Sequence, residues 1–165
     1  MNIVAIIPAR MNSSRFYGKP LANIAGIPMI GHCYFRTSMC ESISKTYVAT
    51  CDDEIKEYIL SIGGNVIMTS KDHERASDRT AEAMLKVEQE TGRRIDIVVM
   101  IQGDEPMIHP EMISLSLKPF YSDDNVLVVN LMSKILNIDE FKDPNEVKVV
   151  VDNSSNAIYF SREPI

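Results

Sequence analysis

The chain has 165 residues, of which 45% are hydrophobic and 24% are charged, and its formal net charge at pH 7 is -6. This length suits one compact domain, and the composition excludes a disordered chain. The acidic balance excludes a broad nucleic-acid surface, and no apolar run approaches the roughly 18 residues of a membrane span. With no signal peptide and an odd number of cysteines, we expect a cytoplasmic protein without a membrane partner.

Apolar runs alternate with helical patterns along the chain. The runs are residues 2–8, 45–50, 65–68, 95–101, 126–131 and 147–151. Their continuous apolar character is typical of strands that are covered on both faces. The alternation predicts a single α/β domain over residues 1–165, with a doubly wound, mostly parallel sheet and helices on both of its faces. Such a sheet binds ligands at the carboxyl ends of its strands.

Helices are predicted between these strands from the spacing of apolar residues. Isoleucines between the second and third runs follow helical spacing, with Asp52 or Asp53 as the N-cap and Gly63 just past the end. Residues 78–91 show a second amphipathic pattern, and a third begins at Pro110. We interpret the apolar faces of these helices as core.

A group of cations follows the first predicted strand. Arg10, Arg15 and Lys19 share one loop with the hydroxyl groups of Ser13 and Ser14. Two unit charges about 4 Å apart repel by roughly 4 kcal/mol at an effective dielectric near 20, so the loop needs either bulk water or an anion. Neither of the common glycine-rich phosphate motifs occurs in the chain. Spacing alone leaves a solvated basic loop and a phosphate-binding loop equally open.

The segment QGDEP, residues 102–106, directly follows the fourth apolar run. Asp104 should therefore lie at the carboxyl end of a strand, facing the same crevice as the cationic loop. An acidic turn after a strand is ordinary by itself. Beside a phosphate cradle, however, one or two carboxylates together with substrate phosphates are the usual ligands of Mg²⁺. The two motifs together favour a nucleotide-phosphate site.

Several longer segments then indicate a family. The segments IIPAR…SSR..GKPL, YVATCDDEI, VIMTSKDH, QGDEPMI, PNEVKVVVD and YFSREPI resemble, in order and spacing, the 3-deoxy-manno-octulosonate (Kdo) cytidylyltransferases. The resemblance covers essentially the whole chain and implies a nucleotide-diphospho-sugar transferase-like fold. It also implies magnesium-dependent transfer of CMP from CTP to the anomeric hydroxyl of an eight-carbon sugar acid, for lipopolysaccharide core synthesis. Pyrophosphate would leave, and a homodimer is expected.

The resemblance further implies roles for individual residues. Those expected to bind CTP are Ala9, Arg10, Ser13, Arg15, Lys19, Asp78, Arg79 and Gln102. Arg15 and Lys19 are expected to act in catalysis by stabilising negative charge on the reacting phosphates, and Asp104 by ligating magnesium. Gln102 and Arg162 are expected to contact the sugar acid.

The segment 72–82 departs from the family pattern. Arg75, Ala76 and Ser77 stand where the family usually has Ser-Gly-Thr, so the selectivity for base or sugar is expected to change. Ser77 is also a candidate N-cap of the following helix.

The family continues well past the position that corresponds to Ile165. We therefore expect a C-terminal segment, with a second magnesium carboxylate and most of the dimer interface, to be missing from the 165 residues. Two alternatives stay open. One is a cytidylyltransferase for a related acid, such as a sialic acid or amino-substituted Kdo, and the other is a catalytically incomplete nucleotide-binding fragment.

Overall fold

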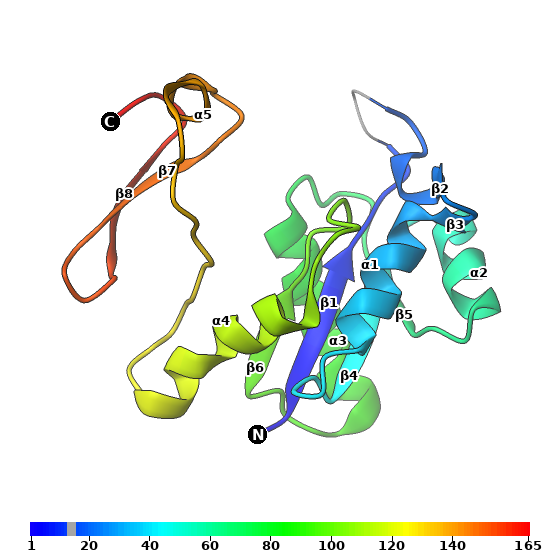
Figure 1. Cartoon of the computed structure of the whole chain (residues 1–165). Coiled ribbons are helices and arrows are strands. Elements are labelled where there is room, and N and C mark those ends of the chain that lie inside the picture. Colours follow the sequence, from blue (N-terminus) through cyan, green and yellow to red (C-terminus); the bar gives the residue numbers. More distant parts are fainter. Residues whose placement is uncertain (13–15) are drawn as a thin grey trace. The chain divides into compact units, whose positions relative to one another are not determined.

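The computed structural model describes residues 1–12 and 16–165. The chain forms two compact units, Met1–Asp124 and Asn125–Ile165, which Figure 1 colours from blue to yellow and from yellow to red. The sequence predicts a single domain, whereas contacts are concentrated within each of these two units. Among the described residues, no helix combines the length and the apolar character that crossing a bilayer requires.

The first unit is built around a parallel sheet of four strands in the order β5-β4-β1-β6. The strands are β1 (Ile3–Pro8), β4 (Lys45–Thr50), β5 (Val66–Met68) and β6 (Ile97–Met100). β1 lies inside the sheet, where Ile6 is opposite both Tyr47 of β4 and Met100 of β6. Every residue of β1 is buried, as its continuous apolar run predicts.

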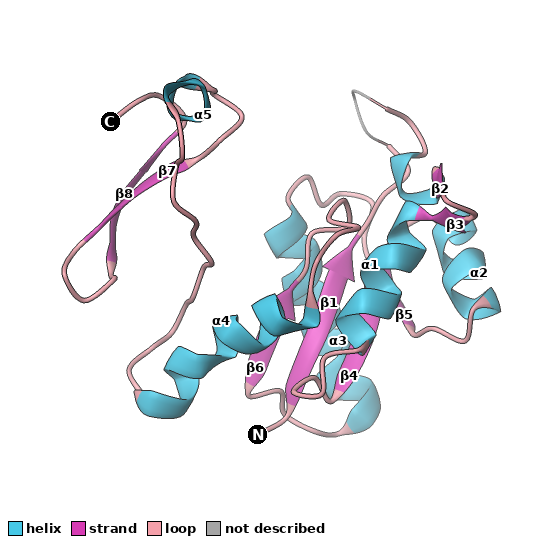
Figure 2. Ribbon diagram, in the orientation of Figure 1, coloured by secondary structure: helices cyan, strands magenta, loops and turns pink. Residues whose placement is uncertain are grey.

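Helices cover both faces of this sheet, as predicted, and Figure 2 shows the strands in magenta among the cyan helices. The helices are α1 (Met29–Ser38), α2 (Asp53–Ser61), α3 (Ala76–Thr91) and α4 (Pro110–Ser122). Ile7 packs into one core cluster with residues of α1, α2 and α4. Its neighbour Ile6 packs into a second cluster with Ala83 and Val87 of α3. Successive residues of a strand point to opposite faces, so the two clusters lie on opposite sides of the sheet.

The helix boundaries agree with the predicted start and stop signals at two of three helices. Asp52 is the N-cap residue of α2, and α4 begins at Pro110. Gly63 follows the C-cap of α2 with φ 74°, the left-handed backbone that glycine adopts without strain. Ser77 as an N-cap is wrong, because α3 begins at Ala76, a strong helix former, with Arg75 as its N-cap residue.

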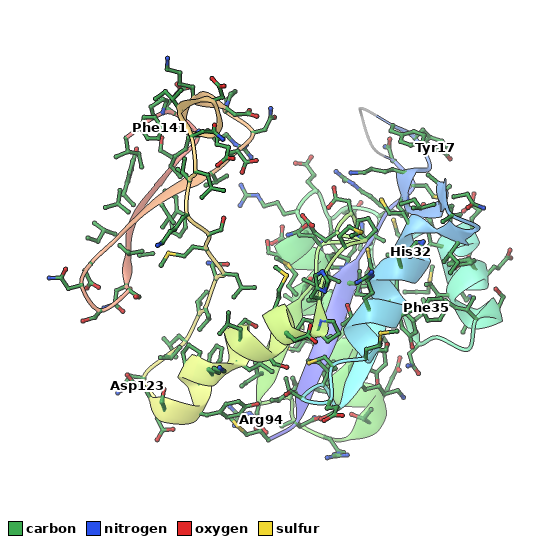
Figure 3. All side chains as sticks on the ribbon, viewed as in Figure 1. Tyr17, His32, Phe35, Arg94, Asp123 and Phe141 are labelled. Atoms are coloured by element: carbon green, nitrogen blue, oxygen red, sulfur yellow. The ribbon has the colours of Figure 1, made fainter. Side chains whose placement is uncertain are left out.

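Between β1 and α1 the chain makes a short 3-10 helix and a small hairpin. The 3-10 helix η1 (Lys19–Leu21) is followed by the antiparallel strands β2 (Asn23–Ile24) and β3 (Ile27–Pro28). Nε2 of His32 in α1, one of the labelled residues in Figure 3, lies 2.8 Å from the carbonyl oxygen of Ile24. A carbonyl can only accept, so the ring donates this hydrogen bond and ties the hairpin to α1.

The second unit contains the helix α5 (Ile138–Lys142) and an antiparallel hairpin of β7 (Lys148–Val151) and β8 (Ala157–Ser161). The prediction of a strand at 147–151 is thus confirmed, although this strand does not pair in parallel. The strand predicted at 126–131 is wrong, because the structure has no strand there. An apolar run becomes a strand only where a neighbour takes its hydrogen bonds, and β7 and β8 pair with each other.

Candidate active site

A pocket with a volume of about 580 Å³ opens at the carboxyl ends of β1 and β6. Its walls come from the loop after β1, from η1, from residues 73–76 and Arg79 at the start of α3, and from the turn 102–104 after β6. After β1 the chain builds β4 and β5 on one side and then returns to place β6 on the other side. The pocket therefore lies at the position where the strand order reverses, which is where open α/β sheets bind their ligands.

The two predicted motifs meet at this position because their backbones pack closely. The amide of Ala9 donates to the carbonyl of Ala49 over 2.9 Å, which continues the β1–β4 pairing into the first residue of the loop. On the other side, a β-carbon added to Gly103 would lie 2.6 Å from the carbonyl oxygen of Pro8. A side chain at position 103 would not fit, so glycine lets the QGDEP turn lie against the end of β1.

Lys19 and Asp104 form an ion pair within the pocket. The ammonium of Lys19 lies 2.6 Å from Oδ2 of Asp104, and the side chains are 35% and 47% exposed. The pair joins residues 85 positions apart in the chain. An exposed ion pair contributes little to stability, so both charges can exchange this partner for a ligand at small cost. The arrangement offers a cation to a phosphate and a carboxylate to a hard metal ion.

Two further residues predicted to bind CTP face the same pocket. The guanidinium Nη1 of Arg10 donates to the carbonyl oxygen of His73 over 3.5 Å, so the arginine links the β1 loop to the segment before α3. Gln102 is exposed in the turn after β6 and forms part of the pocket wall. Ser13 and Arg15 lie outside the described residues, and their roles stay predictions.

Arg79 lies in the wall of the pocket but is almost entirely buried. It is 2% exposed, and its Nη1 donates to the hydroxyl of Thr69, which itself donates to the carbonyl oxygen of Thr50 over 3.2 Å. Nη2 has no hydrogen-bond partner among the described residues. A buried guanidinium needs hydrogen-bond partners, and Arg79 finds one in Thr69. The arginine therefore fixes the start of the segment between β5 and α3. A contact with CTP stays a prediction.

Two predicted residues are not part of the pocket lining. Asp78 is exposed on the first turn of α3. Arg162 belongs to the second unit, where its Nη1 donates to the carbonyl oxygen of Pro144 over 2.9 Å. Nearby Lys148 is 3% exposed, and its ammonium donates to the carbonyl oxygens of Asp143, Glu146 and Arg162. All three of its protons are used, so Lys148 holds the second unit together.

Sequence reasoning missed two carboxylates that support the pocket. Asp52 appeared only as an N-cap, but its Oδ2 accepts a 2.8 Å hydrogen bond from the amide of Met11 and so holds the start of the cationic loop. Glu82 of α3 accepts from the amide of Ser70 and from the ring of His73. Only the i,i+4 spacing of Glu82 and Lys86 could have singled this residue out.

The charge state of Glu82 is set by these partners. The ammonium of Lys86, the amide of Ser70 and the ring of His73 together lower the pKa of Glu82 to about 2 against a smaller opposing effect of burial, with Lys86 the largest cause. Hydrogen bonds to the charged form favour ionisation, so the carboxylate is anionic at neutral pH.

The cysteines do not take part in the site. Cys33 and Cys40 are buried, Cys51 is half-buried, and all three are free. Burial raises the pKa of Cys33 to about 11, so its thiol is protonated and unreactive at neutral pH.

The residues of the pocket could hold Mg²⁺ only if a bound ligand supplied some of the oxygen atoms that coordinate the ion. Within the described ranges, no cluster of three or more His, Cys, Asp or Glu side chains could enclose a metal. Asp104 and Glu74 are the carboxylate residues among the described residues that line the pocket, and Asp104 lies beside Lys19. Mg²⁺ is commonly held by one or two carboxylates, water and substrate phosphates, and a single carboxylate beside a phosphate-binding cation meets that requirement.

Comparison with known proteins identifies the family. The family model described as cytidylyltransferase matches residues 4–165. The chain belongs to this cytidylyltransferase family. A 3-deoxy-manno-octulosonate cytidylyltransferase of Trichlorobacter lovleyi is 47% identical over all 165 residues, and one of Geobacter sulfurreducens is 46% identical. The chain spans 63% and 64% of these two relatives, less than two thirds of their length.

Solved structures agree with this family. A structure of CMP:2-keto-3-deoxy-manno-octonic acid synthetase complexed with CTP has a TM-score of 0.88 and 38% sequence identity. The match covers 100% of this chain and 66% of the other chain. A cytidylyltransferase from Leptospira borgpetersenii has a TM-score of 0.63 at 23% identity, covering 76% of this chain and 51% of that one. At this low identity the second match shows the fold alone.

Proposed function

We propose that this chain is the CTP-binding part of a 3-deoxy-manno-octulosonate cytidylyltransferase, which transfers CMP from CTP to the anomeric hydroxyl of the eight-carbon sugar acid. The observation that carries the proposal is the pocket at the carboxyl ends of β1 and β6, where Arg10, Lys19, Gln102 and Asp104 come together. Support comes from the similar synthetase whose structure contains CTP. A cytoplasmic homodimer is part of the proposal and rests on the family resemblance.

The proposed reaction needs no nucleophile from the protein. The anomeric oxygen of the sugar acid attacks the α-phosphorus of CTP, and the bond from that phosphorus to the bridging β-oxygen breaks. Pyrophosphate leaves with the bonding electron pair, and the hydroxyl proton passes to solvent. Negative charge grows on the phosphate oxygens during this step, so cations placed beforehand lower the barrier.

The residues of the pocket have separate roles in this reaction. Lys19 releases Asp104 and binds the phosphates, because three negatively charged groups outcompete one exposed carboxylate for the ammonium. Arg10 binds from the loop after β1, with its guanidinium oriented by the carbonyl of His73. Asp104, freed from Lys19, would hold Mg²⁺ together with phosphate oxygens, and the ion would supply Lewis-acid stabilisation of the phosphate charge.

One observation favours a second candidate, a cytidylyltransferase for a related sugar acid. Arg75 and Ala76, which replace Ser and Gly of the family pattern, both form part of the pocket wall. Arg75 adds a cation and bulk where the usual residue is small, so the selectivity between substrates is expected to change. The triple change Arg75→Ser, Ala76→Gly and Ser77→Thr should return the preference to that of the family.

Calorimetric titration tests the first proposal. The 165-residue chain is titrated with CTP and with UTP, each with and without Mg²⁺, and pyrophosphate release by the full-length protein is then followed with Kdo and with its amino analogue. We expect saturable binding of CTP that is stronger than that of UTP and that strengthens with Mg²⁺. A chain that binds neither nucleotide would refute the proposed function, and a preference for the amino analogue would favour the second candidate.

A further inference from the structure

Glu82 lies outside the pocket wall but bonds to three different parts of its surroundings. Its Oε2 accepts hydrogen bonds from the amide of Ser70 over 2.9 Å and from Nε2 of His73 over 2.5 Å. Its Oε1 pairs with the ammonium of Lys86 at 2.8 Å. A carboxylate has about four acceptor positions, so this one is largely saturated. The side chain is 25% exposed, which limits competition from water.

These bonds fix the segment that connects β5 to α3. His73 forms part of the pocket wall, and its carbonyl oxygen accepts a hydrogen bond from the guanidinium of Arg10. The segment has a first anchor at Thr69, whose amide donates to the carbonyl oxygen of Thr50 over 2.8 Å. Glu82 supplies a second anchor at Ser70 and His73, so the position of the carbonyl that orients Arg10 depends on it.

Lys86 ties this anchor to the sheet. Besides its pair with Glu82, the ammonium of Lys86 donates to the carbonyl oxygen of Met68, the last residue of β5, over 2.7 Å. One charged network therefore runs from the end of β5, through α3, to the ring of His73. Networks of this kind hold a side chain in one rotamer, which a ligand site needs for accurate contacts.

We infer that Glu82 is a positioning residue of the nucleotide site: it clamps the His73 segment so that Arg10 is held in place to receive CTP. This inference rests on the proposed function, since CTP is the ligand whose affinity should change. Glu82 itself touches neither nucleotide nor metal. Its effect passes through the ring and the carbonyl of His73.

The test compares CTP binding in matched variants of the 165-residue chain. Glu82→Gln keeps the size of the side chain and removes its charge. Glu90→Gln, on the same helix, removes the same charge from an exposed residue whose side chain makes no hydrogen bond or ion pair among the described residues. We expect the CTP dissociation constant to rise about tenfold in Glu82→Gln, the equivalent of losing one charged hydrogen bond, and to stay unchanged in Glu90→Gln.

Two further measurements separate positioning from loss of fold. The Nε2 proton of His73 is followed by ¹H–¹⁵N NMR, and its signal should move in Glu82→Gln while amide signals of β1 and β4 stay in place. His73→Phe, which leaves the carboxylate untouched, should also weaken CTP binding. If Glu82→Gln does not fold, His73→Phe decides the question by itself.

The outcomes are distinguishable. CTP binding to the unmodified chain with no change in Glu82→Gln or His73→Phe would overturn the inference and leave the proposed function standing. Equal weakening in Glu90→Gln would also overturn it, because the effect would then be one of net charge. Absence of CTP binding to the unmodified chain would overturn the proposed function and the inference with it.

Discussion

Replacing Gly103 by alanine tests whether the close contact between the QGDEP turn and the end of β1 positions the site. The added β-carbon would lie 2.6 Å from the carbonyl oxygen of Pro8, and ordinary contact begins near 3.4 Å, so the two atoms must separate by about 0.8 Å. The nearby atom belongs to the backbone of a buried strand, and a side-chain rotation cannot relieve the overlap. Overpacking of this kind typically costs about 1–3 kcal/mol of stability.

The same shift should move Asp104, the next residue, away from Lys19. A misplacement of about 1 Å in a catalytic group can cost roughly 100-fold in rate, so nucleotide handling should suffer as well as stability. Urea denaturation measures the free energy of unfolding, and calorimetric titration measures CTP affinity with Mg²⁺ present. We expect both values to fall in Gly103→Ala.

Gly64→Ala is the matched control. Its β-carbon would lie 2.9 Å from the carbonyl oxygen of Ile59 and 2.5 Å from the side chain of the same residue, at the end of α2 and outside the pocket wall. It should lower the free energy of unfolding while CTP affinity is kept. If Gly103→Ala bound CTP with Mg²⁺ as tightly as the unmodified chain, the contact would not position Asp104 and the argument would be wrong.

Four other predictions concern charges at and near the pocket. Lys19→Met should weaken CTP binding by about 1.5–3 kcal/mol, as judged by titration, and equal affinity would remove Lys19 from the phosphate site. Asp104→Asn should keep the circular dichroism spectrum but abolish the strengthening of CTP binding by Mg²⁺; a retained magnesium effect would contradict its role as a ligand. Arg75→Ser should change the ratio of CTP to UTP affinity, and an unchanged ratio would mean that the departure from the family pattern is neutral. Because the pKa of Glu82 is lowered from 4.5 to about 2 in the folded chain, its stabilising effect is complete above the unfolded value and is lost as pH falls between them. The free energy of unfolding, measured by urea denaturation at several pH values in this range, should therefore decline less steeply with falling pH in Glu82→Gln than in the unmodified chain. Parallel declines would refute the assignment.

Much of the fold follows from local patterns in the sequence. Continuous apolar runs predict strands that are buried on both faces, and β1, β4 and β6 occur where these runs lie. Asp52, Gly63 and Pro110 mark helix ends correctly because capping depends on a few neighbouring residues. The meeting of the cationic loop with Asp104 is also predictable, since parallel strands bring their carboxyl ends to one edge of a sheet.

The partners of individual side chains were decided by the tertiary structure. Nothing in the neighbourhood of Asp52 indicates that its carboxylate bonds to the amide of Met11, 41 positions away. Glu82 likewise gains Ser70 and His73 as partners only because the segment after β5 turns back over α3. The run 126–131 is as apolar as β1 but forms no strand, because strand formation requires hydrogen bonds from a neighbour that its own residues cannot specify. Local sequence determines which residues are apolar and where helices end. Contacts between distant residues depend on strand order and on the path of the connecting segments, which the packing of the whole unit sets.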